Sequence, residues 1–225
     1  MLRGRQEAAQ ERSWAAVGVD TSMTACSVVG VGYDGLLDKM VGPSWAETRW
    51  LPGDDYFKRL AEAAHGEALI HDVLAKLWVI DPAKVYIALE EPWYFGAVKA
   101  GVSGWLKQQA EIAGAFKGSL ARWGYMNMYE INNAQWKKVL RGEGVPILPQ
   151  NKKDPDLKWK VKEWAIQAFG LPEFPDLVKS KSGMKIPRPE EGYGAKAKAV
   201  QPNDIYDAAA CCAWMCDELD RLGLV

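Results

Sequence analysis

The chain of 225 residues is long enough for one domain with a full hydrophobic core and a small appendage. Its composition argues against a membrane or secreted protein, because no apolar run approaches about 18 residues and the N-terminus lacks the apolar centre of a secretory signal; we expect a cytoplasmic protein. The formal net charge of −1 conceals a basic segment, since residues 131–200 hold 14 Lys and Arg residues against 8 Asp and Glu residues. Such a segment fits contact with an anionic polymer, although a solvated lysine-rich surface has the same composition.

The first part of the chain predicts a polar, flexible tail over residues 1–13 and then an antiparallel meander. The apolar runs Trp14 to Asp20 and Ala25 to Val31 predict two strands, and a turn signal after Tyr33 leads into a third strand from Leu36 to Val41. Asp20 ends the first strand at the mouth of a turn. There it can either serve a functional site or only cap that turn through its side chain.

A different kind of strand follows a long helix. After a loop over residues 42–54, the apolar spacing predicts one helix over residues 55–80. Val85 to Leu89 is a nearly continuous apolar run, which is typical of a strand that is covered on both faces and paired in parallel. It delivers Glu90 and Glu91 to its carboxyl end, where ligand sites gather in open α/β sheets. Because neighbouring strand residues face opposite ways, at most one of the two glutamates points to such a site.

The next part of the chain alternates helices with one more strand. We expect a helix over residues 98–123, a strand over 125–131, and a short helix over 134–140. Residues 156–169 predict a basic amphipathic helix. Residues 171–200 contain many turn-forming residues and little apolar periodicity, so they predict a long basic loop, either a functional segment or a surface insertion.

The last helix begins near Pro202 and Asn203 and carries two carboxylates. Pro202 near the first helical position, or Asn203 as N-cap, can open it. Asp204 and Asp207 are three residues apart, so they share one face of the first turn. Acidic residues are common in first helical turns because the helix dipole favours them there, so this pair alone does not establish a site.

Acids therefore stand at the ends of two strands and at the start of the last helix. If Asp20, a glutamate and the Asp204/Asp207 pair converge, their mutual repulsion calls for cations, and hard Mg²⁺ or Mn²⁺ ions prefer oxygen ligands. Two such ions about 4 Å apart can activate a water and stabilise the leaving oxygen of a phosphodiester. The sequence thus indicates metal-dependent phosphoryl chemistry on a nucleic acid.

Three spaced motifs carry these acids: Val17-Gly-Val-Asp20-Thr21, Ala88-Leu-Glu90-Glu91 and Asp204-Ile-Tyr-Asp207-Ala-Ala-Ala. As a set they resemble the RuvC family of Holliday-junction resolvases, in the RNase H-like superfamily, and most of all its divergent phage-encoded, mycobacteriophage-like members. The resemblance implies an α/β, RNase H-like fold, with a five-stranded mixed sheet flanked by helices. It places the nuclease domain at residues 14–225 with a basic loop insertion at about 170–200. The first strand departs from the family's pattern, because it ends Asp-Thr-Ser where the family usually has Asp-Pro-Gly.

The resemblance also implies roles for individual residues. The implied metal ligands and catalytic acids, at a two-metal Mg²⁺ or Mn²⁺ site, are Asp20, Glu90, Asp204 and Asp207. Lys158 is the implied catalytic lysine that stabilises charge on the scissile phosphate, with nearby lysines as alternatives. The implied DNA-binding residues are Lys107, Lys137, Lys138, Lys158, Lys160, Lys181, Lys185, Arg188, Lys196 and Lys198.

The implied activity is that of a structure-specific DNA endonuclease that resolves Holliday junctions and other branched DNA, such as forks and flaps. Hydrolysis would leave 5′-phosphate and 3′-hydroxyl ends. Symmetric cutting needs two active sites, so we expect a homodimer with the helix over 98–123 at its interface, working in the host cytoplasm if phage-encoded. A related nuclease on RNA–DNA hybrids and a DNA-binding protein without cleavage stay open as alternatives. An actin-like or sugar-kinase-type ATPase starts with a similar hairpin but needs a second Asp-Gly-Gly-type loop, which this sequence lacks.

Overall fold

The computed structural model describes residues 13–22, 24–34, 39–51, 55–77, 81–91, 104–149, 154–181, 185–189 and 195–224. Five strands form one mixed sheet in the order β3-β2-β1-β4-β5. Their bounds are β1 (Trp14–Thr21), β2 (Ala25–Asp34), β3 (Lys39–Trp50), β4 (Val85–Glu90) and β5 (Asn127–Ile131). The first three strands pair antiparallel, whereas β4 pairs in parallel with β1 and β5. The expected five-stranded mixed sheet is therefore confirmed.

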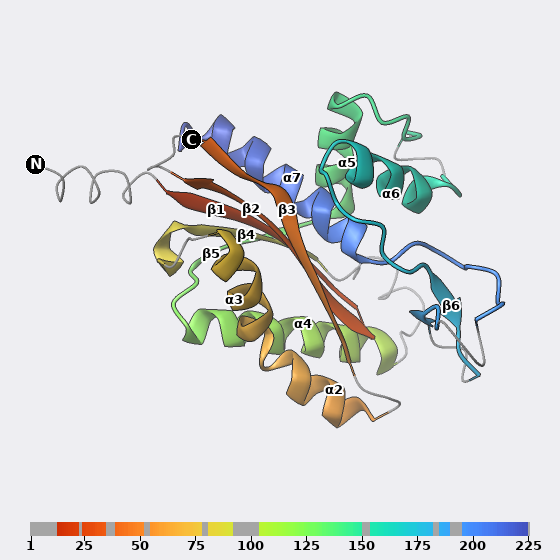
Figure 1. The fold of residues 1–225 in the computed structure, drawn as a ribbon. Helices are drawn as coiled ribbons and strands as arrows, with labels where there is room; N and C mark the ends of the chain where they lie inside the picture. The colour runs from red at the N-terminus through yellow and green to blue at the C-terminus, as the bar shows by residue number, and fades with distance from the viewer. Residues whose placement is uncertain are drawn as a thin grey trace, which may run out of the picture.

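Helices cover both faces of this sheet (Figure 1). The helices on one face are α2 (Tyr56–Ala63), α3 (Gly66–Leu77) and α4 (Gly104–Arg122). Those on the other face are α5 (Asn133–Gly142), α6 (Leu157–Gln167) and α7 (Ile205–Arg221), of which α7 packs directly on β1, β2 and β4. A single 3₁₀ turn, Pro82–Lys84, leads into β4. None of the described helices combines the length and apolarity that a membrane crossing requires.

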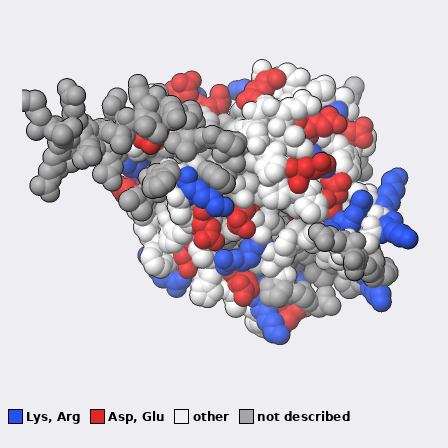
Figure 2. All heavy atoms as spheres, viewed as in Figure 1, with Lys and Arg blue, Asp and Glu red and all other residues white. Residues whose placement is uncertain are grey.

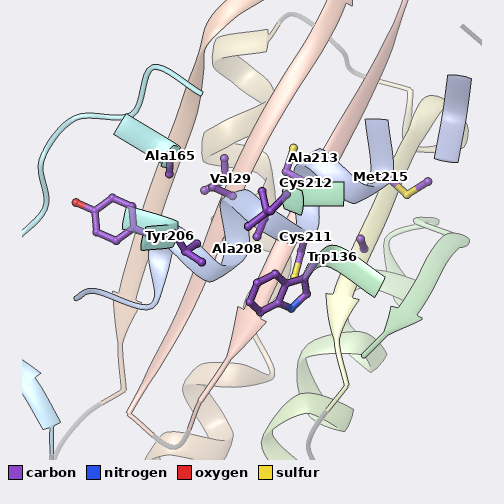
Figure 3. Close-up of a cluster of buried hydrophobic side chains, with 14 of the residues drawn as sticks. Val29, Trp136, Ala165, Tyr206, Ala208, Cys211, Cys212, Ala213 and Met215 are labelled. Carbon is purple, nitrogen blue, oxygen red and sulfur yellow. The ribbon is translucent and has the colours of Figure 1, made fainter. Parts of the chain in front are cut away.

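The central strand β1 divides its side chains between two cores. Val17 and Val19 point into the core beneath α3 and α4, whereas Ala16 belongs to the core beneath α7. Gly18 lies on the α7 side, where a β-carbon would stand 2.0 Å from the Ala208 carbonyl oxygen. Figure 3 shows the small residues of α7 against this face. The absence of a side chain at Gly18 is what allows α7 to approach β1 so closely.

The third strand is longer than the sequence suggested. We expected it to end at Val41 and a loop to span residues 42–54, but β3 continues to Trp50. Antiparallel pairing with β2 holds it, and the hydroxyl groups of Ser27 and Thr48 lie 3.1 Å apart across the two strands. Pro43 is compatible with the strand because β3 is at the edge of the sheet, where a missing backbone donor costs little.

The helix expected over residues 55–80 is two helices. It breaks at Ala64 and His65, between α2 and α3. At the start of α3, a β-carbon on Gly66 would lie 2.3 Å from the Phe116 ring of α4. The glycine therefore permits close packing of α3 on α4. The expected helices over 98–123, 134–140 and 156–169 correspond to α4, α5 and α6, and residues 98–103 lie outside the described residues.

Residues 171–200 are not the loop without regular structure that we expected. They contain a small hairpin of β6 (Leu177–Lys179) and β7 (Lys185–Pro187), which Figure 1 shows beside the start of α7. Leu177 and Val178 are fully buried, and Leu177 exchanges backbone hydrogen bonds with Val200 and Gln201. These contacts join the hairpin to Val200 and Gln201, which lead into α7. Because they link segments that are apart in the sequence, the local sequence pattern does not reveal them.

Candidate active site

Two acids reach the site from adjacent strand ends. Val19 of β1 pairs in parallel with Leu89 of β4, so Asp20 and Glu90, one residue further along each strand, are neighbours at the carboxyl edge of the sheet. Both follow the alternation that places Ala16 and Ala88 beneath α7. Glu90 is thus the one of the two adjacent glutamates that faces the site, as the alternation along the strand requires.

The other two acids come from the start of α7. Asn203 caps the first turn, because its Oδ1 accepts a hydrogen bond of 3.1 Å from the backbone N–H of Ile205. Asp204 occupies the N-cap position without capping the helix with its own side chain. Its carboxylate and that of Asp207, in the first turn, are therefore available to the site, and both residues are buried.

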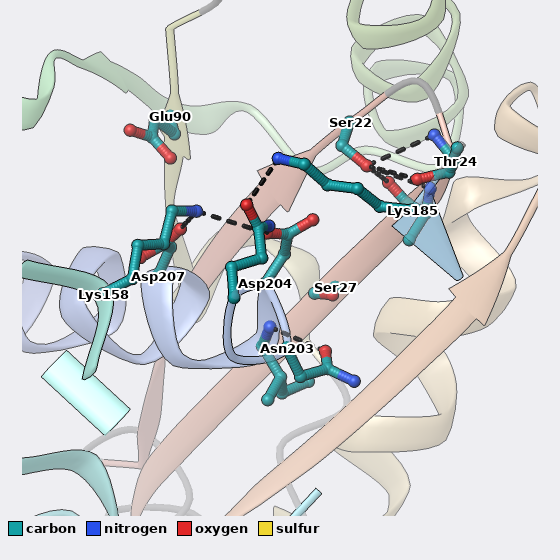
Figure 4. Close-up of polar contacts among 12 residues, drawn as sticks. Ser22, Thr24, Ser27, Glu90, Lys158, Lys185, Asn203, Asp204 and Asp207 are labelled. Atoms are coloured by element: carbon teal, nitrogen blue, oxygen red, sulfur yellow. Dashed lines mark hydrogen bonds and ion pairs between the residues drawn. The ribbon is translucent and has the colours of Figure 1, made fainter. Parts of the chain in front are cut away.

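Three of the four predicted metal ligands converge closely. Each of Asp20, Asp204 and Asp207 offers a carboxylate oxygen, and these oxygens all lie within 4.8 Å of one another. Glu90 stands beside this acidic cluster but outside that set (Figure 4). Its Oε1 accepts a long hydrogen bond of 3.5 Å from the indole N–H of Trp136. Trp136 is buried on α5 and was not among the residues we predicted for the site.

Burial and mutual repulsion raise the pKa of Asp20, Glu90 and Asp207 at this site. Burial raises the pKa of Asp20 well above its usual range, and the charges of Glu90, Asp204 and Asp207 raise it further. Burial, followed by the charge of Asp207, raises the pKa of Glu90 to about 7. Burial also raises the pKa of Asp207. A site with these properties favours either protons or cations.

Lys158 of α6 supplies a positive charge at this position. Its Nζ lies 3.2 Å from Oδ1 of Asp204 and donates a hydrogen bond to Oδ2 of Asp207. Burial alone would lower the pKa of Lys158, but the charges of Asp207, Asp204 and Asp20 outweigh it and raise that pKa well above its usual range. The ammonium group therefore stays charged among the carboxylates.

The donor set fits a hard divalent cation. It consists of carboxylate oxygens only, it gathers more negative than positive charge, and it already attracts an ammonium group. Such an ion could be held by Asp20, Asp204 and Asp207, with Glu90 beside them as a further carboxylate.

A second lysine approaches the same acids from the opposite side (Figure 4). Lys185 of β7 donates a hydrogen bond to Oε1 of Gln201, and Nε2 of Gln201 donates one of 2.9 Å to Oδ1 of Asp204. Burial lowers the pKa of Lys185. We predicted Lys185 only as a DNA contact and did not predict Gln201 at all. The one available signal was the position of Gln201, three residues before Asp204.

The other predicted DNA-binding residues differ in their surroundings. Lys137 of α5 is half-buried over the Trp136 ring, and the charges of Glu90 and Asp207 act on it. Lys160 is committed within the protein, since its Nζ lies 3.0 Å from Asp154 Oδ2 and 2.8 Å from the Pro146 carbonyl oxygen. The remaining predicted DNA contacts are exposed side chains. Lys107 lies on α4, in the layer opposite α6. The others lie on α5 or around the hairpin: Lys138, Lys181, Arg188, Lys196 and Lys198.

Comparison with known proteins gives similarity at the level of structure only. No protein-family model matches the chain, and no curated protein sequence matches it. A solved structure of T. thermophilus RuvC in complex with Holliday junction substrate superposes with a TM-score of 0.50 at 13% identity, covering 94% of this chain and 97% of that one. The chain has a RuvC-like fold. A second Thermus thermophilus RuvC structure gives a TM-score of 0.49 at 15% identity, covering 93% of this chain and 97% of that one.

Within this RuvC-like fold the acidic cluster lies at the carboxyl ends of β1 and β4, beneath the first turn of α7. Ligand sites of open α/β sheets gather at that edge. At this level of sequence identity the resemblance extends only to the arrangement of elements, and the chemistry of the site depends on its own residues.

Proposed function

We propose that this chain is a metal-dependent, structure-specific DNA endonuclease that resolves Holliday junctions and related branched DNA. The observation that carries the proposal is the convergence of Asp20, Asp204 and Asp207 from two elements into one acidic cluster within a RuvC-like fold. The solved RuvC structure that it resembles was obtained with Holliday junction substrate, which supports branched DNA as the substrate class.

Each acid has a proposed role at the metal site. As the motif resemblance implies, Asp20 at the end of β1 would be a ligand shared by the ions, with Glu90 and Asp207 as flanking ligands. Asp204 is either a further ligand or a group that orients the attacking water. Bound Mg²⁺ or Mn²⁺ would lower the pKa of that water and stabilise charge on the oxygens of the scissile phosphate.

The proposal assigns Lys158 to the scissile phosphate. Its Nζ is held by Asp204 and Asp207, so this ammonium group would lie beside a phosphate that is bound at the acidic cluster. The water oxygen bonds to phosphorus, the bond from phosphorus to the 3′-oxygen breaks, and a proton passes to that oxygen. The products are a 5′-phosphate and a 3′-hydroxyl.

The DNA path proposed here runs over the basic residues beside the acidic cluster. Figure 2 shows Lys and Arg side chains projecting at the edge of the molecule where Figure 1 places β6. Lys185, Arg188 and Lys181 belong to this hairpin region, and Lys137 of α5 lies near enough to Glu90 and Asp207 for their charges to act on it. Basic side chains that flank a cleavage site suit the phosphates on either side of the cut.

Several further features belong to the proposal. Residues 14–225 would form the nuclease domain with residues 170–200 as its DNA-contacting insertion, preceded by a tail over 1–13. Two copies would form a homodimer through the α4 side, because symmetric resolution of a four-way junction needs two active sites. The motif resemblance to phage-encoded members favours a role in the cytoplasm of a host cell.

A panel of labelled four-way junction, fork, flap, linear duplex and RNA–DNA hybrid substrates tests the proposal. With Mg²⁺ or Mn²⁺ we expect cutting of branched DNA in preference to linear duplex, and ligatable nicks that carry 5′-phosphate ends. Preferential cutting of the hybrid would instead identify an RNase H-type enzyme. Cutting in excess EDTA would contradict the role of the acids.

A further inference from the structure

The β6–β7 hairpin is connected to the acidic cluster through the side chain of Gln201. The Gln201 amide lies between Lys185 and Asp204 and bonds to both, accepting with Oε1 and donating with Nε2. An ammonium group can only donate, so Lys185 selects the oxygen end of the amide and leaves the nitrogen end for Asp204. The hydrogen bonds thus define the amide orientation.

The backbone holds Gln201 in place independently of its side chain. Its carbonyl oxygen accepts a 2.8 Å hydrogen bond from Leu177, and the two residues form an isolated antiparallel bridge. Leu177 is fully buried, and Asp176 beside it accepts a hydrogen bond of 2.8 Å from Lys162 of α6. The backbone of Gln201 is therefore hydrogen-bonded to the hairpin at the point where the chain leads into α7.

Asp204 depends on neighbours for its orientation. Its side chain makes no capping bond to its own helix, and its Oδ1 accepts from both Gln201 and Lys158. Lys158 would turn toward the phosphate when substrate binds under the proposed function. Gln201 is then the donor that continues to fix the carboxylate.

We propose that Gln201 is a positioning residue that orients Asp204 for cation binding, with Lys185 of the hairpin fixing the direction of its amide. The inference rests on the proposed function, because it assigns Asp204 to a metal site. Hydrogen-bonding partners of ligating carboxylates typically contribute about 10- to 100-fold to metal affinity. The hairpin is in this way part of the metal site as well as a basic surface.

Titration calorimetry with Mn²⁺ in the absence of DNA tests the inference. Gln201→Met keeps the length of the side chain and removes both hydrogen bonds, and we expect about 10-fold or greater weakening of Mn²⁺ binding. Gln201→Asn keeps the amide but is too short to bridge both partners, so it should weaken binding similarly and decides the matter if the first variant does not fold. The matched control is Gln167→Met, at an exposed position at the end of α6, which should bind as the unmodified protein does.

A double-mutant cycle separates positioning from a general structural role. In an Asp204→Asn background, Gln201→Met should change Mn²⁺ affinity less than about 2-fold, because its effect passes through Asp204. If Gln201→Met lowers the melting temperature but leaves Mn²⁺ affinity unchanged, the inference is overturned. The proposed function survives that result if Asp20→Asn abolishes Mn²⁺ binding. Absence of saturable Mn²⁺ binding by the unmodified protein would overturn both.

Discussion

The Nζ of Lys158 lies 3.2 Å from Oδ1 of Asp204 and also binds the carboxylate of Asp207, so an ammonium group occupies the position that a divalent cation would favour. A metal ion held by these acids would therefore compete with the lysine for the same oxygens. Under the proposed function, Lys158 would therefore both oppose cation binding and contact the scissile phosphate.

Lys158→Met should consequently separate the two roles. We expect tighter Mn²⁺ binding in calorimetry, because a competing positive charge is removed, together with at least about 100-fold slower cleavage, because the scissile phosphate loses its charged donor. Lys117→Met, on α4 in the opposite layer, is the control and should leave Mn²⁺ affinity unchanged. Weaker Mn²⁺ binding by Lys158→Met would contradict the competition.

The close approach of α7 to β1 predicts intolerance at Gly18. A β-carbon there would stand 2.0 Å from the Ala208 carbonyl oxygen and 2.2 Å from the Cys212 backbone nitrogen, so Gly18→Ala must displace α7. We expect destabilisation of about 3 kcal/mol or more in urea unfolding, at the upper end of overpacking effects. Gly114→Ala, in α4 with no atom near the added carbon, should instead stabilise by roughly 0.5–1 kcal/mol. Equal effects of the two substitutions would refute the packing argument.

The raised pKa of Glu90 predicts how the stability of the metal-free protein depends on pH. Burial raises its pKa from 4.5 to about 7, so within that window the folded state holds a proton that the unfolded chain has released. Stability therefore falls as pH rises through the window. The raised pKa of Lys158 adds no slope there, because that lysine is charged in both states below its usual value.

Thermal unfolding in EDTA at pH 5 and pH 8 measures this dependence. The melting temperature should fall toward pH 8, and Glu90→Gln should reduce the fall, because an amide does not titrate in this range. Mn²⁺ should raise the melting temperature most at pH 8, where its ligands are deprotonated. An identical pH dependence in both proteins would show that the Glu90 pKa is not raised.

DNA affinity should depend on the hairpin and not on Lys160. Neutralising Arg188 and Lys181 together should weaken binding of a four-way junction and reduce the slope of log K against log salt by about 2. Lys160→Gln should change that slope little, since Lys160 is bound to Asp154 and the Pro146 carbonyl oxygen. Fluorescence anisotropy over a salt series makes both measurements, and the opposite ranking would reverse the proposed DNA path.

The strands and helices that hold the site, and the acidic residues that they carry, were predictable because local sequence patterns mark them. An apolar run that ends on an acid defines β1 with Asp20 and β4 with Glu90, and small residues after Asp207 define the buried side of α7. The continuous apolar character of β4 also correctly indicated parallel pairing.

The failures of sequence-based prediction share a non-local cause. The extension of β3 to Trp50 depends on its pairing with β2, and the short strands β6 and β7 depend on anchoring of Leu177 near α7. For the same reason Gln201 and Trp136 were missed, because their roles arise only when the insertion and α5 fold against the acids. Apart from the position of Gln201, three residues before Asp204, the local pattern of those segments does not report such contacts.

Cleavage of a labelled four-way junction by the Asp20→Asn variant, with Mn²⁺ and beside the unmodified protein, tests the metal-site assignment most directly. The substitution keeps the shape of the side chain and removes one negative charge from the acidic cluster. We predict unchanged junction binding and cleavage slowed by at least about 100-fold, as when a transition-state contact is lost. Equal cutting by both proteins would contradict the assignment of these acids to catalysis.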